Sequence, residues 1–220
     1  QRQMCIRDRV LLSNNPFAPS ITRNQFGELI AVSTSYFNEE KTNVSGIDVE
    51  LNFFRATKFG NLDYSIKATQ LSKFLTPGFI NEENSEIGST MINRVGKFNY
   101  DANTHSLPKL RLNTFLNFEF NKIFFGINSR YIQGFSNERE IPTSAVELGY
   151  SNEIKSFLVH DFSITKLFQS NLGEIQIGLG IINAFDKQAP LLFDAPDFSF
   201  DTRTHEPRGR LINLSAEFNF

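Results

Sequence analysis

The sequence predicts an all-β fold, and more specifically a segment of an antiparallel transmembrane β-barrel. Seven segments alternate apolar and polar residues with a period of two, the pattern of a two-faced strand. The connections between these segments alternate strictly between short and long. No uninterrupted apolar run is long enough for a membrane-spanning helix. In an antiparallel meander alternate turns lie at the same end, so one rim should carry the short turns and the other the long loops.

The N-terminal residues 1–9 read "QRQMCIRDR" and resemble no other part of the chain. It is rich in arginine, lacks alternation and contains the only cysteine. We interpret it as translated adapter or cloning-derived sequence, with an ordinary extension as the alternative. Neither interpretation makes it a signal peptide, because no apolar h-region follows. The remaining 10–220 are expected to form one unit, and the lack of thiols there permits an oxidising compartment.

The next stretch, residues 13–44, has the weakest pattern. It contains the turn-forming "SNNPFAPS" and the strand-like "GELIAVSTSYF". The polar part is too long for the short-turn rim. We therefore expect 13–44 to form an excursion on the long-loop side that contains a short hairpin.

Seven strands follow in order. They are expected at 45–59, 61–75, 108–120, 122–134, 154–168, 173–184 and 209–220. The alternation weakens in 122–134, where Asn128 and Arg130 share the face of apolar residues, and in 154–168, which His160 and Lys166 interrupt. Strands of ten residues or more exceed the five or six that are usual in soluble sheets.

The connections are short at 60–61, 121–122 and 169–173, and long at 76–107, 135–153 and 185–208. A soluble up-and-down barrel is the alternative, since it also alternates faces and uses hairpins. Its loops of about 20 to 30 residues would need packing partners that the sequence does not supply. The difference between a rim of short turns and a rim of long loops therefore favours an outer-membrane barrel.

Aromatic residues gather near the predicted strand ends, as expected for two membrane-interface girdles. The short-turn rim holds Phe54, Phe59, Phe118, Phe120, Phe124, Phe125, Phe168, Phe218 and Phe220. The long-loop rim holds Phe74, Tyr131, Phe135, Phe157 and Phe185. The lipid-facing, convex side should carry Leu112, Leu116, Ile175, Ile177, Leu214 and Phe218.

Four motifs in order resemble the C-terminal barrel of TonB-dependent outer-membrane receptors. They are "NEEKTNVSGIDVELNF", "VHDFSITKLF", "IINAFDKQAP" and "EPRGRLINLSAEFNF". The resemblance spans 38–220 and implies an open fragment of a roughly 22-stranded barrel, with an N-terminal plug and TonB box absent from this chain. It also implies location in the bacterial outer membrane and partners in lipid, the missing plug and strands, the TonB complex and the assembly machinery.

Enzymatic chemistry is not expected. His160 and Asp161 are adjacent on one strand and point to opposite faces, so they cannot act together in a Ser/His/acid triad. The last long loop carries Asp194, Asp197, Asp201 and His205, whose irregular spacing favours a solvated acidic loop over a cation site. No cofactor or metal is expected. The net charge of −2 with scattered basic residues argues against a nucleic-acid partner.

Three groups of residues are candidates for function. The lumen-facing residues are Arg111, Glu119, Arg130, Asp161 and Glu174, which contact the plug or substrate or else only pair with one another. The candidate ligand-binding residues in the last long loop are Phe198, Phe200, Arg203 and His205, with a shielding loop as the alternative. The assembly signal is Phe218 and Phe220, and the alternative for Phe220 is a simple girdle residue.

The function expected from these features is that of an active outer-membrane transporter for a large, scarce ligand. An iron chelate, haem, cobalamin, a glycan or a peptide would each fit. A passive porin-like barrel is the main alternative, followed by a soluble all-β binding module. A segment with two open sheet edges and an unpaired lipid face should not fold alone in water.

Overall fold

The protein is all-β with antiparallel sheets in a computed structural model. The structure describes residues 21–32, 41–77, 91–99, 105–171, 173–195 and 198–219. The long strands are β3 (Asn43–Thr57), β4 (Gly60–Pro77), β8 (Leu110–Phe120), β9 (Ile123–Ile132), β12 (Phe157–Ser170), β13 (Gly173–Ile182) and β14 (Leu211–Asn219). All seven predicted strands are therefore present, within a few residues of their expected bounds.

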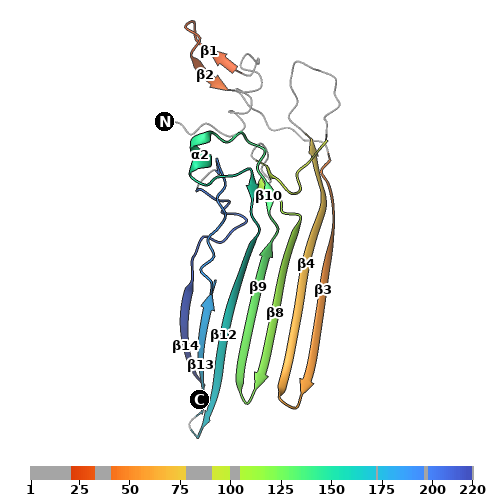
Figure 1. Cartoon of the computed structure of the whole chain (residues 1–220), viewed down its shortest axis with the longest axis vertical. Helices are drawn as coiled ribbons and strands as arrows, with labels where there is room; N and C mark the ends of the chain where they lie inside the picture. Colours follow the sequence, from red (N-terminus) through yellow and green to blue (C-terminus); the bar gives the residue numbers. More distant parts are fainter. Residues whose placement is uncertain are drawn as a thin grey trace.

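These seven strands form one sheet in which each pairs with its neighbours along the chain. The order is β14-β13-β12-β9-β8-β4-β3, and β5 (Met91–Asn93) extends the sheet beside β4. Figure 1 shows the short turns together at one end, and the described parts of the long connections at the other. The nearest-neighbour order and the two unlike rims confirm the pattern expected from the connection lengths.

The short turns have local causes in the sequence. Asn121 and Lys122 have φ of 49° and 61°, which is the type I′ geometry that matches the twist of paired strands. The β3–β4 hairpin closes between Thr57 and Gly60. Gly60 has a φ of 145°, and a Cβ there would lie 2.1 Å from the carbonyl oxygen of Glu119. This position therefore requires glycine.

Beyond the long-loop end, β1 (Ile21–Arg23) and β2 (Leu29–Val32) form a small antiparallel hairpin (Figure 1). This confirms the hairpin expected within 13–44. The side chain of Asn24 fixes its turn, because Oδ1 accepts from the backbone N–H groups of Phe26 and Glu28.

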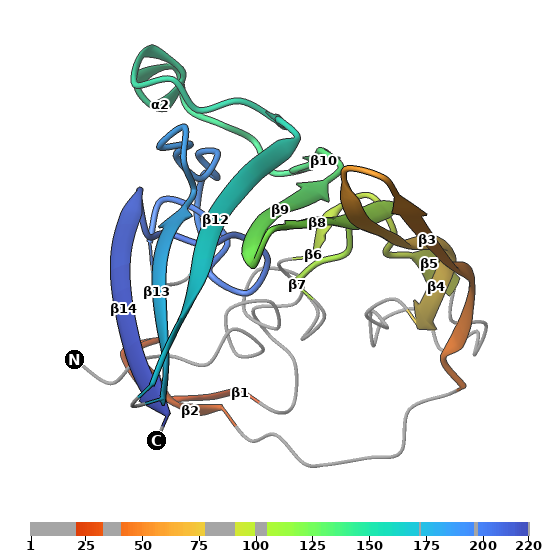
Figure 2. The same ribbon diagram turned by 90° about the horizontal axis from the view of Figure 1, so that it is seen from below.

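The sheet is curved (Figure 2), and the pairing register gives its two faces different side chains. The pairing register places the six predicted lipid-facing residues on one face of the sheet. Phe157 lies on the other face, where it contacts His205 of the last long loop. That loop lies inside the curve of the sheet, so the six residues are on the convex face (Figure 2). They form no closed core, since Leu214 is 80% exposed and Ile177 is 49% exposed. Within the described residues the sheet is open and does not close into a barrel, because β3 and β14 have no partner on their outer edges.

The aromatic girdles are only partly as predicted. Phe54 pairs with Asp63, and Phe124 with Glu119, so both rings lie on the concave, polar face. Phe135 and Phe157 are buried in a core beneath the long loops, with exposed fractions of 6% and 3%. These four assignments were wrong because aromatic residues near strand ends also serve packing inside the curve. Phe220 lies outside the described residues.

The long connections form a compact cap with its own core. The core comprises Phe98, Phe135, Ile154 and Leu192, with Ala195 packed against it. The short strands of the cap are β6 (Phe98–Asn99), β7 (His105–Ser106), β10 (Phe135–Ser136) and β11 (Glu153–Ile154), and its helix is α2 (Thr143–Glu147). Figure 2 places β6 and β7 on the concave side of the sheet. The cap thus fixes the position of the loops relative to the strands.

The two C-terminal motifs meet in a clasp that closes the last long loop. Asn183 Nδ2 donates to the carbonyl oxygens of Lys187 and Arg208, at 3.0 and 3.4 Å, and its Oδ1 accepts from the Lys187 N–H. Asp186 Oδ1 accepts from the Arg210 N–H at 2.8 Å. A Cβ on Gly209 would lie 2.6 Å from the same oxygen. The "NAFDK" and "PRGR" runs therefore share one local structure that brings the two ends of the loop together.

Candidate functional site

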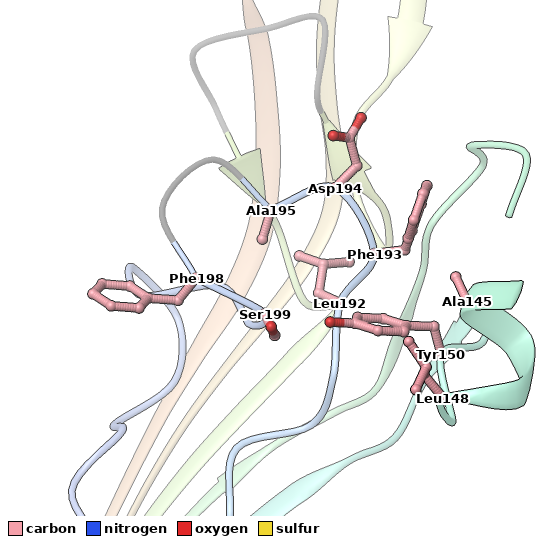
Figure 3. Close-up of a pocket in the computed structure, with 9 residues that line it drawn as sticks. All are labelled: Ala145, Leu148, Tyr150, Leu192, Phe193, Asp194, Ala195, Phe198 and Ser199. Carbon is pink, nitrogen blue, oxygen red and sulfur yellow. The ribbon is translucent and has the colours of Figure 1, made fainter. Parts of the chain in front are cut away.

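A cavity of about 560 Å³ lies between two loops of the cap (Figure 3). One wall belongs to the α2 segment and the turn after it, and the other belongs to the last long loop. The lining residues are Ala145, Leu148, Tyr150, Leu192, Phe193, Asp194, Ala195, Phe198 and Ser199. The volume falls in the range of small-molecule sites, but the hollow is widely open to solvent and only about half of its lining is apolar.

The wall from the last long loop is fixed at its base. The N–H of Leu192 donates to the carbonyl oxygen of Ser199 at 2.8 Å, which holds these two residues together. Leu192 is 1% exposed and belongs to the cap core. Asp194 has a φ of 60°, a left-handed conformation that Asp tolerates better than most residues.

Two polar contacts join this loop to the preceding long loop. Asn137, which is 1% exposed, donates from Nδ2 to the carbonyl oxygen of Phe193 at 3.1 Å. Its Oδ1 accepts from the N–H of Arg139. The guanidinium of Arg139 bonds Asp194 Oδ2 at 2.7 Å, and both side chains are partly exposed. Loops that are far apart in sequence are thereby held as one unit.

The opposite wall is built from α2 and a tight turn. The N–H of Tyr150 donates to the carbonyl oxygen of Ala145 at 3.1 Å, and Gly149 takes the positive φ of 91° that this turn requires. The Tyr150 ring meets the edge of Phe193 with centroids 5.8 Å apart. Figure 3 shows Tyr150 reaching across towards the loop that carries Leu192 and Ser199.

His205 anchors the last long loop against Phe135 of the cap core and against Phe157. Its ring stacks on Phe135 at 5.9 Å and meets the edge of Phe157 at 5.2 Å. The side chain is 3% exposed, and neither ring nitrogen has a hydrogen-bond partner in the described part of the chain. Burial lowers the pKa of His205 to about 4; Asp201 opposes this shift, and the positive charge of Arg111 adds to it. The ring is therefore neutral at neutral pH.

The four predicted ligand-binding residues have different environments. Phe198 is among the lining residues, although Figure 3 shows its ring directed away from the other side chains. Phe200 stacks on Phe198 with centroids 5.7 Å apart. Arg203 is exposed but does not line the cavity, and His205 is buried. A direct ligand contact therefore stays a prediction for all four residues, although His205 is only 3% exposed in this structure.

The five predicted lumen-facing residues share the concave face of the sheet. Two of them pair across strands: Arg130 and Asp161 form an ion pair at 3.2 Å. Asp161 also accepts from Asn128 Nδ2 at 3.1 Å and from the N–H of Asn183 at 2.9 Å. This network joins the strands to the clasp, so for Arg130 and Asp161 the local geometry favours the pairing role.

The expected separation of His160 from Asp161 is present. His160 Nδ1 lies 2.7 Å from Ser129 Oγ on the convex face, whereas Asp161 bonds on the concave face. The described residues contain no group of three His, Cys, Asp or Glu side chains that could hold a metal ion. Asp201 is buried and accepts from the N–H of Arg203, so the expectation of a fully solvated acidic loop was wrong for this residue. Asp197 lies outside the described residues.

Sequence reasoning missed the α2 side of the site. Tyr150 and Asn137 lie in a connection that we treated only as a long loop. A local signal existed, because the Pro in "IPTSAVELGY" followed by helix-compatible residues and a Gly is typical of a short helix with a turn after it. No comparable signal marks Asn137, whose partner is a backbone carbonyl 56 residues away.

Comparisons with known proteins add no assignment. No protein-family model matches the sequence, and no curated protein shows a significant match to it. The described residues include no helix that is long and apolar enough to cross a membrane.

Proposed function

We propose that this chain is the C-terminal barrel portion of a TonB-dependent active transporter in the bacterial outer membrane. The observation that carries the proposal is the exposed apolar face on the convex side of seven long antiparallel strands. A continuous exposed apolar face of this kind is unfavourable in water and suits a lipid contact. The four C-terminal motifs supply the link to the receptor class.

Two further features support the proposal. The long loops form a capped rim with a cavity, and the opposite rim has minimal turns, as in barrels whose long loops face outward. The concave face is polar and carries an ion-pair network, which suits contact with water, substrate or a plug. Energy for uptake would come through the plug and the TonB complex, so these strands need no nucleotide site.

The test uses the protein that contains this chain, expressed from its own gene. Membranes are separated on a density gradient, and the outer-membrane fraction is probed for a band that shifts on heating. The proposal predicts a heat-modifiable band in that fraction and cross-linking between the same protein and TonB. Recovery in the aqueous fraction would favour the soluble binding module and reject the proposal.

The porin alternative is separated by osmotic swelling of proteoliposomes. A plugged transporter should not admit small neutral sugars, whereas an open porin should cause rapid swelling. Swelling at porin rates, without cross-linking to TonB, would assign the chain to a passive barrel.

A further inference from the structure

We propose that the convex surface around Lys166, beside the short turns, binds a phospholipid whose headgroup has a net negative charge. This selectivity rests on the proposed outer-membrane function, because the convex face meets lipid only in that setting. It goes beyond general lipid contact, because it specifies the charge of the headgroup and the rim at which the lipid binds.

Lys166 is an exposed cation within an apolar surface. It lies on the convex face of β12, where its pairing partners are Ile123 of β9 and Ile177 of β13. The diagonal neighbours on these two strands, Phe125 and Ile175, are apolar as well. Lys166 forms no ion pair within the described residues. An ammonium group in such surroundings gains an anionic partner only from outside the sheet.

The pairing register places Lys166 near the short-turn end of the sheet (Figure 1). Its partner Ile123 is the first residue of β9 and directly follows the turn at 121–122. The Lys166 ammonium lies 4.9 Å from the centroid of the Phe168 ring, and Phe168 is two residues closer to the end of β12. This contact directs the charge towards the rim. A lysine there can keep its stem on apolar surface while its ammonium reaches the phosphates of the headgroup layer.

The distribution of charge on the strands favours a net negative headgroup over a zwitterionic one. Every Asp and Glu of the seven long strands lies on the concave face, among them Glu119, Asp161 and Glu174. The Lys and Arg residues on the convex face of these strands are Arg55 and Lys166. A phosphatidylcholine headgroup carries a cation beside its phosphate, and the convex face of the described strands has no carboxylate to bind that cation. A headgroup without its own cation avoids this unfavourable contact.

A second position beside the short turns repeats the arrangement. Arg55 is exposed on the convex face of β3 opposite Leu62. In the turn that follows, the Lys58 ammonium lies 4.8 Å from the centroid of the Phe59 ring. In the proposed orientation both positions face the periplasmic leaflet, where phospholipid headgroups lie. The recurrence at two separate hairpins indicates that cations beside aromatic rings are a property of this rim.

The experiment is native mass spectrometry of the full-length, detergent-solubilised protein, titrated with phosphatidylglycerol or with phosphatidylcholine of the same acyl chains. We expect phosphatidylglycerol to bind about fivefold more tightly. Lys166→Gln should remove most of that preference, whereas Lys166→Arg should keep it. The matched control is Lys122→Gln, which removes a charge at the same rim. It should keep the preference, because the Lys122 ammonium bonds to Gln169 on the concave face.

Equal affinity of the wild-type protein for the two lipids would overturn this inference, and that comparison depends on no variant. A preference that persists unchanged in folded, heat-modifiable Lys166→Gln would overturn it as well. Displacement of the bound lipid by glycerol 3-phosphate would assign the site to soluble anions. A protein dimer that is lost in Lys166→Gln, in place of a headgroup preference, would assign it to a protein contact.

The proposed function is tested separately on the same preparations, through outer-membrane location and heat modifiability. If those properties hold while the headgroup preference is absent, the lipid inference is wrong and the proposed function survives.

Discussion

Replacing Leu214 by arginine separates a lipid-facing sheet from a soluble one. Leu214 is 80% exposed and packs against little protein, so in water the change should alter the free energy of unfolding by no more than about 0.5 kcal/mol. It lies one residue from the middle of β14, about 3 Å along the strand from the midpoint. In a bilayer an arginine near this depth should cost roughly 2–4 kcal/mol.

The cost of an arginine should also depend on its depth in the bilayer, which a second position in β14 can test. Ile212 has the same chemistry, shares the convex face and is 66% exposed, but it lies nearer the rim. There the cost of arginine in a bilayer falls towards about 0–1 kcal/mol. Ser215→Arg is the matched control, because Ser215 faces the concave side opposite Gly178.

The assay is guanidinium unfolding of the full-length protein in phospholipid vesicles, followed by the electrophoretic shift on heating. The expected order of destabilisation is Leu214→Arg, then Ile212→Arg, then Ser215→Arg. Three equal values, or a neutral Leu214→Arg, would refute the assignment of the convex face to lipid.

The remaining predictions concern the cap, the clasp and the C-terminus. Because the pKa of His205 is lowered from about 6.5 to about 4, its contribution to cap stability is fully present above pH 6.5 and is lost as the pH falls through 4. A spin label at exposed Thr202, with Cys5 replaced, should become mobile as the pH falls from about 6.5 to about 4. His205→Phe should abolish this pH-dependent change in mobility. Asp186→Ala removes the acceptor for the Arg210 N–H and should destabilise the β13–β14 pair by about 1–3 kcal/mol, whereas Gln188→Ala, which removes only a 3.4 Å bond to the Asp186 carbonyl oxygen, should have a clearly smaller effect. Gly60→Ala should lower the yield of folded protein, since the new Cβ meets backbone rather than a movable side chain. Deleting Phe220 should reduce the amount of heat-modifiable protein in the outer membrane, and unchanged assembly would leave it only a girdle role.

The sequence alone determined the strands, their order and their two faces. Period-two alternation is a local property of the sequence. When neighbouring strands each have one apolar face, a shift of one residue in their pairing would move the apolar side chains to the polar face, so the register is restricted. The turn at Asn121 and Lys122 is equally local, because a two-residue connection favours the type I′ hairpin and Asn121 tolerates the positive φ that this turn requires. For these reasons the sheet could be predicted strand by strand from the printed residues.

Only the tertiary structure decided what the long loops do. His205 looked like a ligand-binding residue in sequence, yet it fills the space between Phe135 and Phe157, which belong to two other segments. The cavity requires Tyr150 and Phe193 to meet, although 43 positions separate them and no repeating pattern links them. Loop packing depends on contacts between irregular segments distant in sequence, and such contacts leave no periodic signal for sequence reasoning to read.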